Sequence, residues 1–168
     1  MVMEKNLITL AKVIERCAPP SPEYIRPWLR RLRDLTATKA VPVAARQHEG
    51  AGKHRLYDPN IIPLAAVLLR LGDCGVQIGN LSSLAPVILH PRKKVDRGAK
   101  QVWDWALAHD LHDYQEAWLA ISPIPIAGGV DFAAGYGPIT LLDDPAAPDT
   151  CVIVVYLSRI FRQIKAGG

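Results

Sequence analysis

The sequence lacks the short motifs by which several common classes of protein are recognised. Its three cysteines, Cys17, Cys74 and Cys151, are far apart and form no C-x-x-C or C-x-x-H pair, so they offer neither a common zinc-site spacing nor a redox pair. G-x-S-x-G, H-E-x-x-H and the Walker glycine pattern are also missing, which argues against the commonest hydrolase and nucleotide-binding sites. An odd number of scattered cysteines is typical of a reducing compartment, where a thiol serves as a small buried apolar group.

Long apolar segments are missing as well. The longest apolar run, 61–69, contains Pro63 and is too short to cross a bilayer. The amino terminus has no apolar segment followed by a small-residue cleavage site, as a signal peptide would have. Hydrophobic residues make up 49% and charged residues 21% of the 168 residues, which is an ordinary globular composition. These features predict a soluble, cytoplasmic protein with no membrane partner.

Charge is unevenly distributed along the chain. Residues 1–100 hold 17 of the 20 Lys and Arg but only 8 of the 16 Asp and Glu, whereas residues 101–168 hold the remaining 3 bases and 8 acids. A basic half next to an acidic half predicts that the first half meets a polyanion and the second does not. The split therefore favours two modules with separate roles.

The segment 21–57 carries the most informative pattern. A helix beginning near Pro22 would place four apolar residues on one stripe, and three arginines would fall together on a different face at i, i+4 and i+7. The stripe consists of Ile25, Trp28, Leu29 and Leu32, and the arginines are Arg26, Arg30 and Arg33. Like charges at this spacing repel one another, and a bound polyanion would remove that repulsion. A solvated helix face is the alternative for these three arginines.

A second basic element follows the helix. Lys53, His54 and Arg55 stand beside Gly50 and Gly52 in a segment too rich in glycine to be core. An arginine-faced helix followed by a basic, hairpin-like loop is the layout of a winged helix-turn-helix on DNA.

The predicted fold class is α+β: an N-terminal winged helix-turn-helix over residues 1–91, then a small α+β module with an antiparallel sheet over residues 92–168. Apolar periodicity and turn signals define the elements. Helices are expected at 6–16, from 22, from 59 to about 72, at 76–90, at 99–109 and at 158–165. An edge strand or irregular wing entry is expected within 35–47, with strands at 56–57, 116–122 and 151–157 and weaker ones within 128–142.

Fourteen prolines interrupt these patterns. Ser21 with Pro22, and Asp58 with Pro59, are pairs typical of a helix N-cap and first position. Pro27 predicts a kink or a restart of its helix near Arg26, because proline removes a backbone hydrogen bond. Similarly, a kink is expected at Pro63 and an interruption at Pro86.

The first ninety or so residues resemble the winged-helix domain of MerR-type transcription regulators. The similarity runs through Ile8-Thr-Leu-Ala-Lys, Ser21-Pro-Glu-Tyr-Ile-Arg-Pro-Trp-Leu, Gly52-Lys-His-Arg-Leu-Tyr-Asp and the two helices of 64–78. It implies that the second helix enters the major groove while the basic wing holds the DNA backbone. The tight turn of that family is here lengthened by Cys17-Ala-Pro-Pro, and neither its long dimerising helix nor its metal-sensing cysteines have a counterpart in this sequence.

The resulting hypothesis is a sequence-specific DNA-binding transcription regulator without a cofactor. Its partners would be double-stranded DNA and a second copy of the chain, with RNA polymerase as a further candidate. The dimer is expected to form through the sheet that includes 151–157, because no coiled coil is present. The residues predicted to contact DNA are Ser21, Tyr24, Arg26, Arg30, Arg31 and Arg33 of the helix, and Arg46, Lys53, His54, Arg55 and Tyr57 of the wing.

Other functions remain open at this stage. A protein–protein adaptor built on a winged helix that no longer binds DNA is the main alternative, and an enzyme is a more distant one. His109, His112 and Asp113 have a spacing that would let them face one metal ion on a helix end. Glycines near 128 and 135 would suit either turns or the lining of a ligand pocket.

Overall fold

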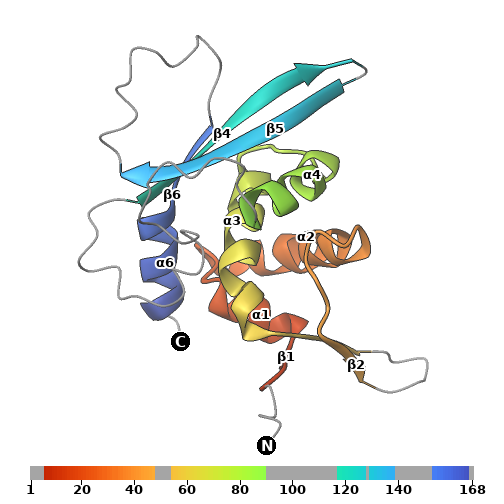
Figure 1. The fold of residues 1–168 in the computed structure, drawn as a ribbon. Coiled ribbons are helices and arrows are strands. Elements are labelled where there is room, and N and C mark those ends of the chain that lie inside the picture. The colour runs from red at the N-terminus through yellow and green to blue at the C-terminus, as the bar shows by residue number, and fades with distance from the viewer. Residues whose placement is uncertain (1–5, 48–53, 90–116, 128, 139–152, 167–168) are drawn as a thin grey trace, which may run out of the picture. The chain divides into compact units, whose positions relative to one another are not determined.

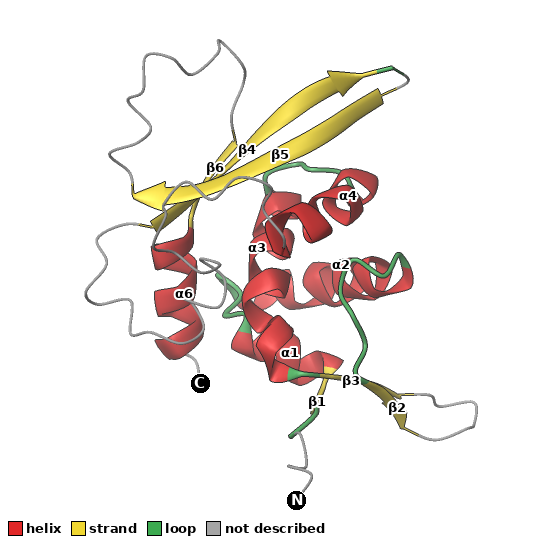
Figure 2. Ribbon diagram, in the orientation of Figure 1, coloured by secondary structure: helices red, strands yellow, loops and turns green. Residues whose placement is uncertain are grey.

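The computed structural model describes residues 6–47, 54–89, 117–127, 129–138 and 153–166 (Figure 1). The chain divides into two compact units, one made of residues 1–82 with 163–168 and the other of residues 83–162. Helices and antiparallel strands both occur (Figure 2), which confirms the α+β class. The boundary predicted after Pro91 and the helix predicted at 99–109 lie outside the described residues. Within the described ranges, no helix is long and apolar enough to cross a membrane.

Within the described residues, the first unit begins with a short strand and includes the start of α4, up to Ser82, together with the end of the last helix, from Gln163. Its elements in chain order are β1 (Ile8–Thr9), α1 (Leu10–Arg16), the 3-10 turn η1 (Pro22–Tyr24), α2 (Ile25–Ala37), β2 (Ala45–Gln47), β3 (His54–Tyr57), the 3-10 turn η2 (Pro59–Ile61), α3 (Ile62–Asp73) and α4 (Ile78–Leu89).

A small antiparallel sheet joins the amino terminus to the β2–β3 hairpin. Its strand order is β1-β3-β2, and Ile8 lies opposite Tyr57 while Ala45 lies opposite Leu56. The helix predicted from Asn6 is therefore wrong in its first residues: Ile8 and Thr9 pair with β3, and α1 starts at Leu10. Pairing with β3 keeps both residues extended, and Thr9 then serves as the N-cap of α1, its side chain accepting a hydrogen bond from the Lys12 amide.

Helices α1, α2 and α3 contact one another and enclose the core of this unit. Every residue of α3 from Ile62 to Leu69 is buried, so α3 is the central helix. Helix α2 contributes a buried stripe of Trp28, Leu32, Leu35 and Thr36. The predicted stripe is confirmed at Trp28 and Leu32 but wrong at Ile25, which is 40% exposed because it stands at the first position of α2.

Two prolines of the first unit lie where helices begin. Pro27 and Pro63 follow 3-10 turns and lie in the first turns of α2 and α3, where an amide hydrogen has no carbonyl partner within the α-helix. The restart predicted near Arg26 is confirmed, since α2 begins at Ile25, whereas Pro63 needs no kink within α3. Pro86 was predicted to interrupt a helix, but α4 continues through it.

The connection from α2 to β2 differs from the prediction. Helix α2 extends to Ala37 and only 45–47 form a strand, so the strand or wing entry expected from Leu35 is wrong over most of its length. Leu35 belongs to the buried stripe of α2, and its carbonyl accepts a hydrogen bond from the Val41 amide, 3.2 Å away. Burial of Leu35 therefore outweighs the alternating pattern that follows it in the sequence.

The second unit contains an antiparallel sheet of three strands and most of a terminal helix. Its elements are β4 (Ala117–Ile126), β5 (Gly129–Pro138), β6 (Ile153–Tyr156) and α6 (Leu157–Ala166), and the strand order is β5-β4-β6. The strands predicted at 116–122 and 151–157, the weaker strand within 128–142 and the helix at 158–165 are thereby confirmed. Within the described residues, β6 lies at an edge of this sheet.

Two prolines lie in the part of β4 that pairs with β5 but not with β6. Strand β4 pairs with β5 along its whole length, from Ala117 opposite Pro138 to Ile126 opposite Gly129, but β6 pairs only with 118–121. Pro123 and Pro125 lie beyond that segment. Because backbone groups two residues apart face the same side of a strand, both proline nitrogens, which lack an N–H, face one side of β4.

Cys17 packs between α1 and α3. Its side chain has no exposed surface, and its Sγ lies 3.6 Å from the carbonyl oxygen of Ile62. Burial raises the pKa of the Cys17 thiol to about 12, and the positive charge of Arg70 partly opposes that shift. The prediction of a buried apolar thiol is confirmed at Cys17 but wrong at Cys74, which is exposed; Cys151 lies outside the described residues.

This burial predicts a loss of stability at high pH. Above pH 9 the Cys17 thiol ionises in the unfolded chain but stays protonated in the folded one, so the free energy of unfolding falls as the pH approaches 12. Urea unfolding at pH 8 and pH 10 should show about 1 kcal/mol more loss in the wild type than in Cys17→Ala. Labelling of Cys17 in the folded protein at pH 8 as fast as that of exposed Cys74 would contradict this account.

Candidate nucleic-acid interface

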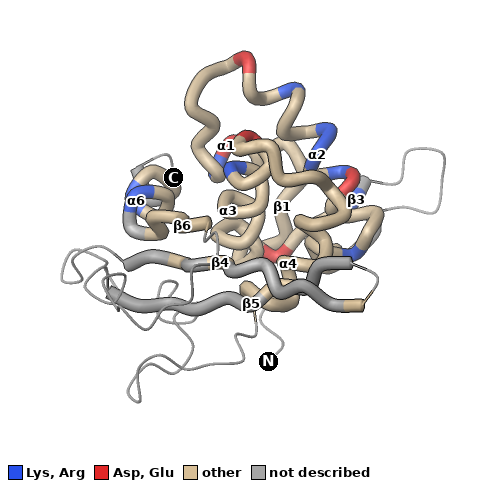
Figure 3. Tube along the Cα trace, turned by 90° about the horizontal axis from the view of Figure 1, so that it is seen from above, with Lys and Arg blue, Asp and Glu red and all other residues tan. Residues whose placement is uncertain are grey.

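Helix α2 presents its charged face opposite its buried stripe. Arg26, Arg30 and Arg33 are all exposed, whereas Trp28 and Leu32 on the other side have no exposed surface. Basic positions run along α2 in Figure 3. The helical periodicity of 3.6 residues brings the three arginines to one face, as the sequence predicts. Within the described residues, no ion pair neutralises any of them.

A carboxylate at the end of α3 holds α2 in place. Asp73 accepts hydrogen bonds from two side chains of α2: Trp28 Nε1 donates to its Oδ2 at 2.9 Å, and Arg31 Nη1 donates to its Oδ1 at 2.6 Å. The same Arg31 nitrogen also lies 2.8 Å from the carbonyl oxygen of Leu69. Both carboxylate oxygens thus have donors from α2, and the charged pair is only about one quarter exposed.

Arg31 therefore has a structural role that the sequence did not reveal. It was predicted to contact DNA along with the neighbouring arginines, but its guanidinium is turned toward α3 and its charge is already paired. Close approach explains the glycine at position 72, since a Cβ atom there would lie 2.5 Å from Arg31 Nε. The sequence signal that could have separated Arg31 from Arg30 is its helical position, beside Trp28 and Leu35 and away from Arg26.

Arg70 of α3 covers the other side of Trp28. Its guanidinium carbon lies 5.4 Å from the centre of the indole ring, a cation–π contact, and Nη2 donates to the carbonyl oxygen of Ala18 at 3.2 Å. Burial lowers the pKa of Arg70, while Cys17 and Asp73 act in the opposite direction. Tyr24 also contacts Trp28 in a T-shaped arrangement, with the ring centres 6.3 Å apart, so Trp28 is held by three side chains.

The β2–β3 hairpin carries the predicted wing residues. Arg46 and Arg55 lie opposite each other, and so do Gln47 and His54. The Arg55 guanidinium reaches α2, where Nη1 lies 3.5 Å from the carbonyl oxygen of Arg33. The structure therefore brings Arg55 next to the arginine face of α2, while Lys53 lies outside the described residues.

Tyr57 was predicted to contact DNA, and the structure shows that this is wrong. Its side chain has no exposed surface, and its hydroxyl lies 3.2 Å from Thr36 Oγ1. Because Thr36 donates its own hydrogen to the carbonyl oxygen of Leu32 at 2.7 Å, Tyr57 is the donor to Thr36. Tyr57 thus anchors β3 to the buried side of α2.

Ser21 also differs from its prediction. Its backbone is extended before η1, as an N-cap requires, but its side chain makes no capping hydrogen bond. Its Oγ is buried and has no partner in the described part of the chain. The hydroxyl is therefore not exposed on the surface, and contact of the partly exposed residue Ser21 with DNA stays a prediction. The other predicted cap is confirmed, since Asp58 accepts a hydrogen bond from the Asn60 amide at 3.0 Å.

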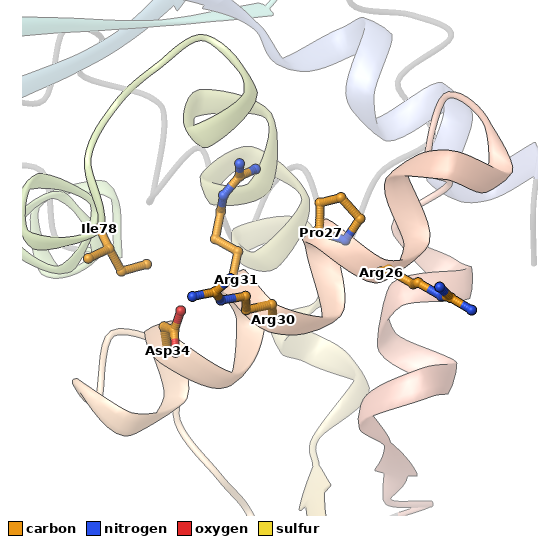
Figure 4. Close-up of a pocket in the computed structure, with 6 residues that line it drawn as sticks. All are labelled: Arg26, Pro27, Arg30, Arg31, Asp34 and Ile78. Carbon is orange, nitrogen blue, oxygen red and sulfur yellow. The ribbon is translucent and has the colours of Figure 1, made fainter.

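An open depression lies against the exposed face of α2 (Figure 4). Its volume is about 520 Å³. The lining residues are Arg26, Pro27, Arg30, Arg31, Asp34 and Ile78. All of them except Ile78, the first residue of α4, belong to α2. No group of three metal-ligating side chains occurs within the described ranges, and the predicted cluster of His109, His112 and Asp113 falls outside them.

The geometry around Asp73 predicts a large stability effect at one carboxylate. Asp73→Ala leaves Trp28 Nε1 and the Arg31 guanidinium without their acceptor, so it should lower the free energy of unfolding by about 2–3 kcal/mol in urea titrations. The matched control is Glu15→Ala, which removes the exposed Lys12–Glu15 pair and should cost less than about 1 kcal/mol. Equal losses in the two variants would show that Asp73 does not hold α2.

No protein-family model matches the sequence, and no curated protein is significantly similar to it. The function must therefore be argued from the site itself, in which an arginine-faced helix and a basic hairpin are brought together by one core.

Proposed function

We propose that the first unit is a winged helix-turn-helix that binds double-stranded DNA, as part of a sequence-specific transcription regulator. The observation that carries the proposal is the exposed face of α2, where Arg26, Arg30 and Arg33 stand together. The opposite face of the same helix is held in the core by Trp28 and Arg31. Such a helix can enter the major groove with its cationic side chains already oriented.

The order of the elements supports the same interpretation. A helix pair, α1 and α2, is followed by the antiparallel β2–β3 hairpin, and β1 completes the sheet. In a winged helix the second helix reads bases and the hairpin contacts the backbone. Arg55 lies where α2 and the hairpin meet, so it is suited to a phosphate beside the groove.

The proposal is tested by fluorescence anisotropy with duplexes obtained by selection from a random pool. Binding should weaken steeply with salt, because each phosphate contact releases counterions. Arg30→Ala should cost about 1–3 kcal/mol of binding free energy and relax the preference at one base position. Arg55→Ala should weaken binding to all duplexes alike and reduce the salt slope by about one unit.

The control is Arg162→Ala, which removes an exposed arginine of α6. This variant should bind selected duplexes like the wild type. If it weakens binding as much as Arg30→Ala does, affinity reflects only net charge. If no duplex is bound at low salt, the alternative of a protein–protein adaptor is favoured, because that function needs no phosphate contacts.

We further propose that the regulator acts as a homodimer through the edge of the second sheet. Strand β6 contains Ile153, Val154, Val155 and Tyr156. Within the described residues it pairs on one side only, with β4, and Tyr156 is 40% exposed. An apolar strand with one unpaired edge is a template for a second strand. Two copies would also pair two helices across a symmetric DNA site, which raises specificity.

Light scattering of the full chain tests the dimer. The expected mass is twice the 18.4 kDa of one chain. Tyr156→Lys should shift the protein toward monomers, since a lysine on an edge strand opposes pairing. A wild-type monomer at micromolar concentration, or a Tyr156→Lys dimer of unchanged stability, would rule out this interface.

A further inference from the structure

One carboxylate lies within the basic face of α2. Asp34 is the only acidic residue among the thirteen of this helix, and it is exposed. It lines the same depression as Arg26 and Arg30 (Figure 4). Within the described part of the chain, its carboxylate has neither an ion pair nor a hydrogen bond. The spacing of four residues from Arg30 gives a weak surface attraction, but no direct contact within the described residues requires an acid at this position.

A carboxylate on a DNA-facing helix lowers affinity for DNA of any sequence, because it is repelled by phosphates. An ionised carboxylate accepts hydrogen bonds but cannot donate them, so it can bind only a base edge that presents a donor. In the major groove, cytosine presents the N4 amino group as a donor, whereas guanine presents the acceptors O6 and N7 and thymine the acceptor O4. Adenine also presents a donor, N6, but beside the acceptor N7. A carboxylate there therefore favours cytosine, opposes guanine and thymine, and gains less from adenine.

Arg30 lies one helical turn before Asp34 and lines the same depression. An arginine donates two hydrogen bonds to guanine, at O6 and N7. Side chains four residues apart on a helix have Cβ atoms about 5–6 Å apart, and successive bases of a strand are about 3.4 Å apart. The two side chains can therefore address one base pair or two neighbouring ones.

We propose that Asp34 is a specificity-determining residue that accepts a hydrogen bond from cytosine N4, beside Arg30 on guanine. The inference rests on the proposed DNA-binding function and adds to it the base that the depression selects. Asp34 lowers affinity for DNA in general and recovers it only where a cytosine is correctly placed. Sequence preference thus arises from rejecting wrong bases as well as from binding the right one.

The experiment selects duplexes from a random pool with the full-length wild type, Asp34→Ala and Asp34→Asn, and then measures anisotropy on a selected and on a random duplex. Asp34→Ala should bind the random duplex roughly two- to fivefold more tightly at equal salt. It should also lose the cytosine preference at one position, with discrimination there falling roughly tenfold. Asp34→Asn should shift that position toward adenine, because an amide makes two hydrogen bonds to adenine at N6 and N7.

Glu23→Ala is the matched control, since Glu23 is an exposed acid in η1, just before α2, and does not line the depression. It should tighten binding to both duplexes by the same factor and leave every base preference in place. Wild-type binding with a base preference that Asp34→Ala leaves unchanged overturns the assignment of Asp34 alone. A wild type that binds no duplex overturns the proposed function itself, so the two failures are distinguishable.

Discussion

The carboxylate of Asp73 is the contact on which the arrangement of the candidate interface depends. It joins the last residue of α3 to two side chains of α2, Trp28 and Arg31. Both oxygens of this partly exposed carboxylate accept hydrogen bonds from α2, so rotation of α2 would break both of them. The orientation of Arg26 and Arg30 follows from this restraint, because they belong to the same rigid helix.

Helix α2 thereby divides its charged residues between two tasks. Arg31 is paired within the fold, whereas Arg26, Arg30 and Arg33 are exposed and form no ion pair within the described residues. Local repulsion among like charges costs only tenths of a kcal/mol per pair. The internal hydrogen bonds and the burial of Trp28 stabilise the helix by more than this repulsion costs. The fold can therefore keep three exposed arginines close together, where a polyanion could bind them.

Much of the secondary structure could be predicted from the sequence. Turn residues and apolar periodicity located α2, α3, β3, β6 and α6 to within a few residues. Errors occurred where a long-range contact decided the local state: Ile8 and Thr9 are extended because they pair with β3, and Leu35 stays helical because its side chain is buried. A periodicity argument uses only a short window of neighbouring residues. It therefore detects neither the pairing with β3 nor the burial of Leu35.

For the candidate site, the sequence by itself determined the composition of the exposed helix face, since the spacing of Arg26, Arg30 and Arg33 puts them together in any α-helix. Tertiary structure alone decided which charged and polar side chains are available to a ligand. Arg31 is paired with Asp73, 42 residues away, and Tyr57 is buried against Thr36. The physical reason is that periodicity gives the direction of a side chain around its helix, whereas burial and hydrogen bonding depend on which distant segments pack against it.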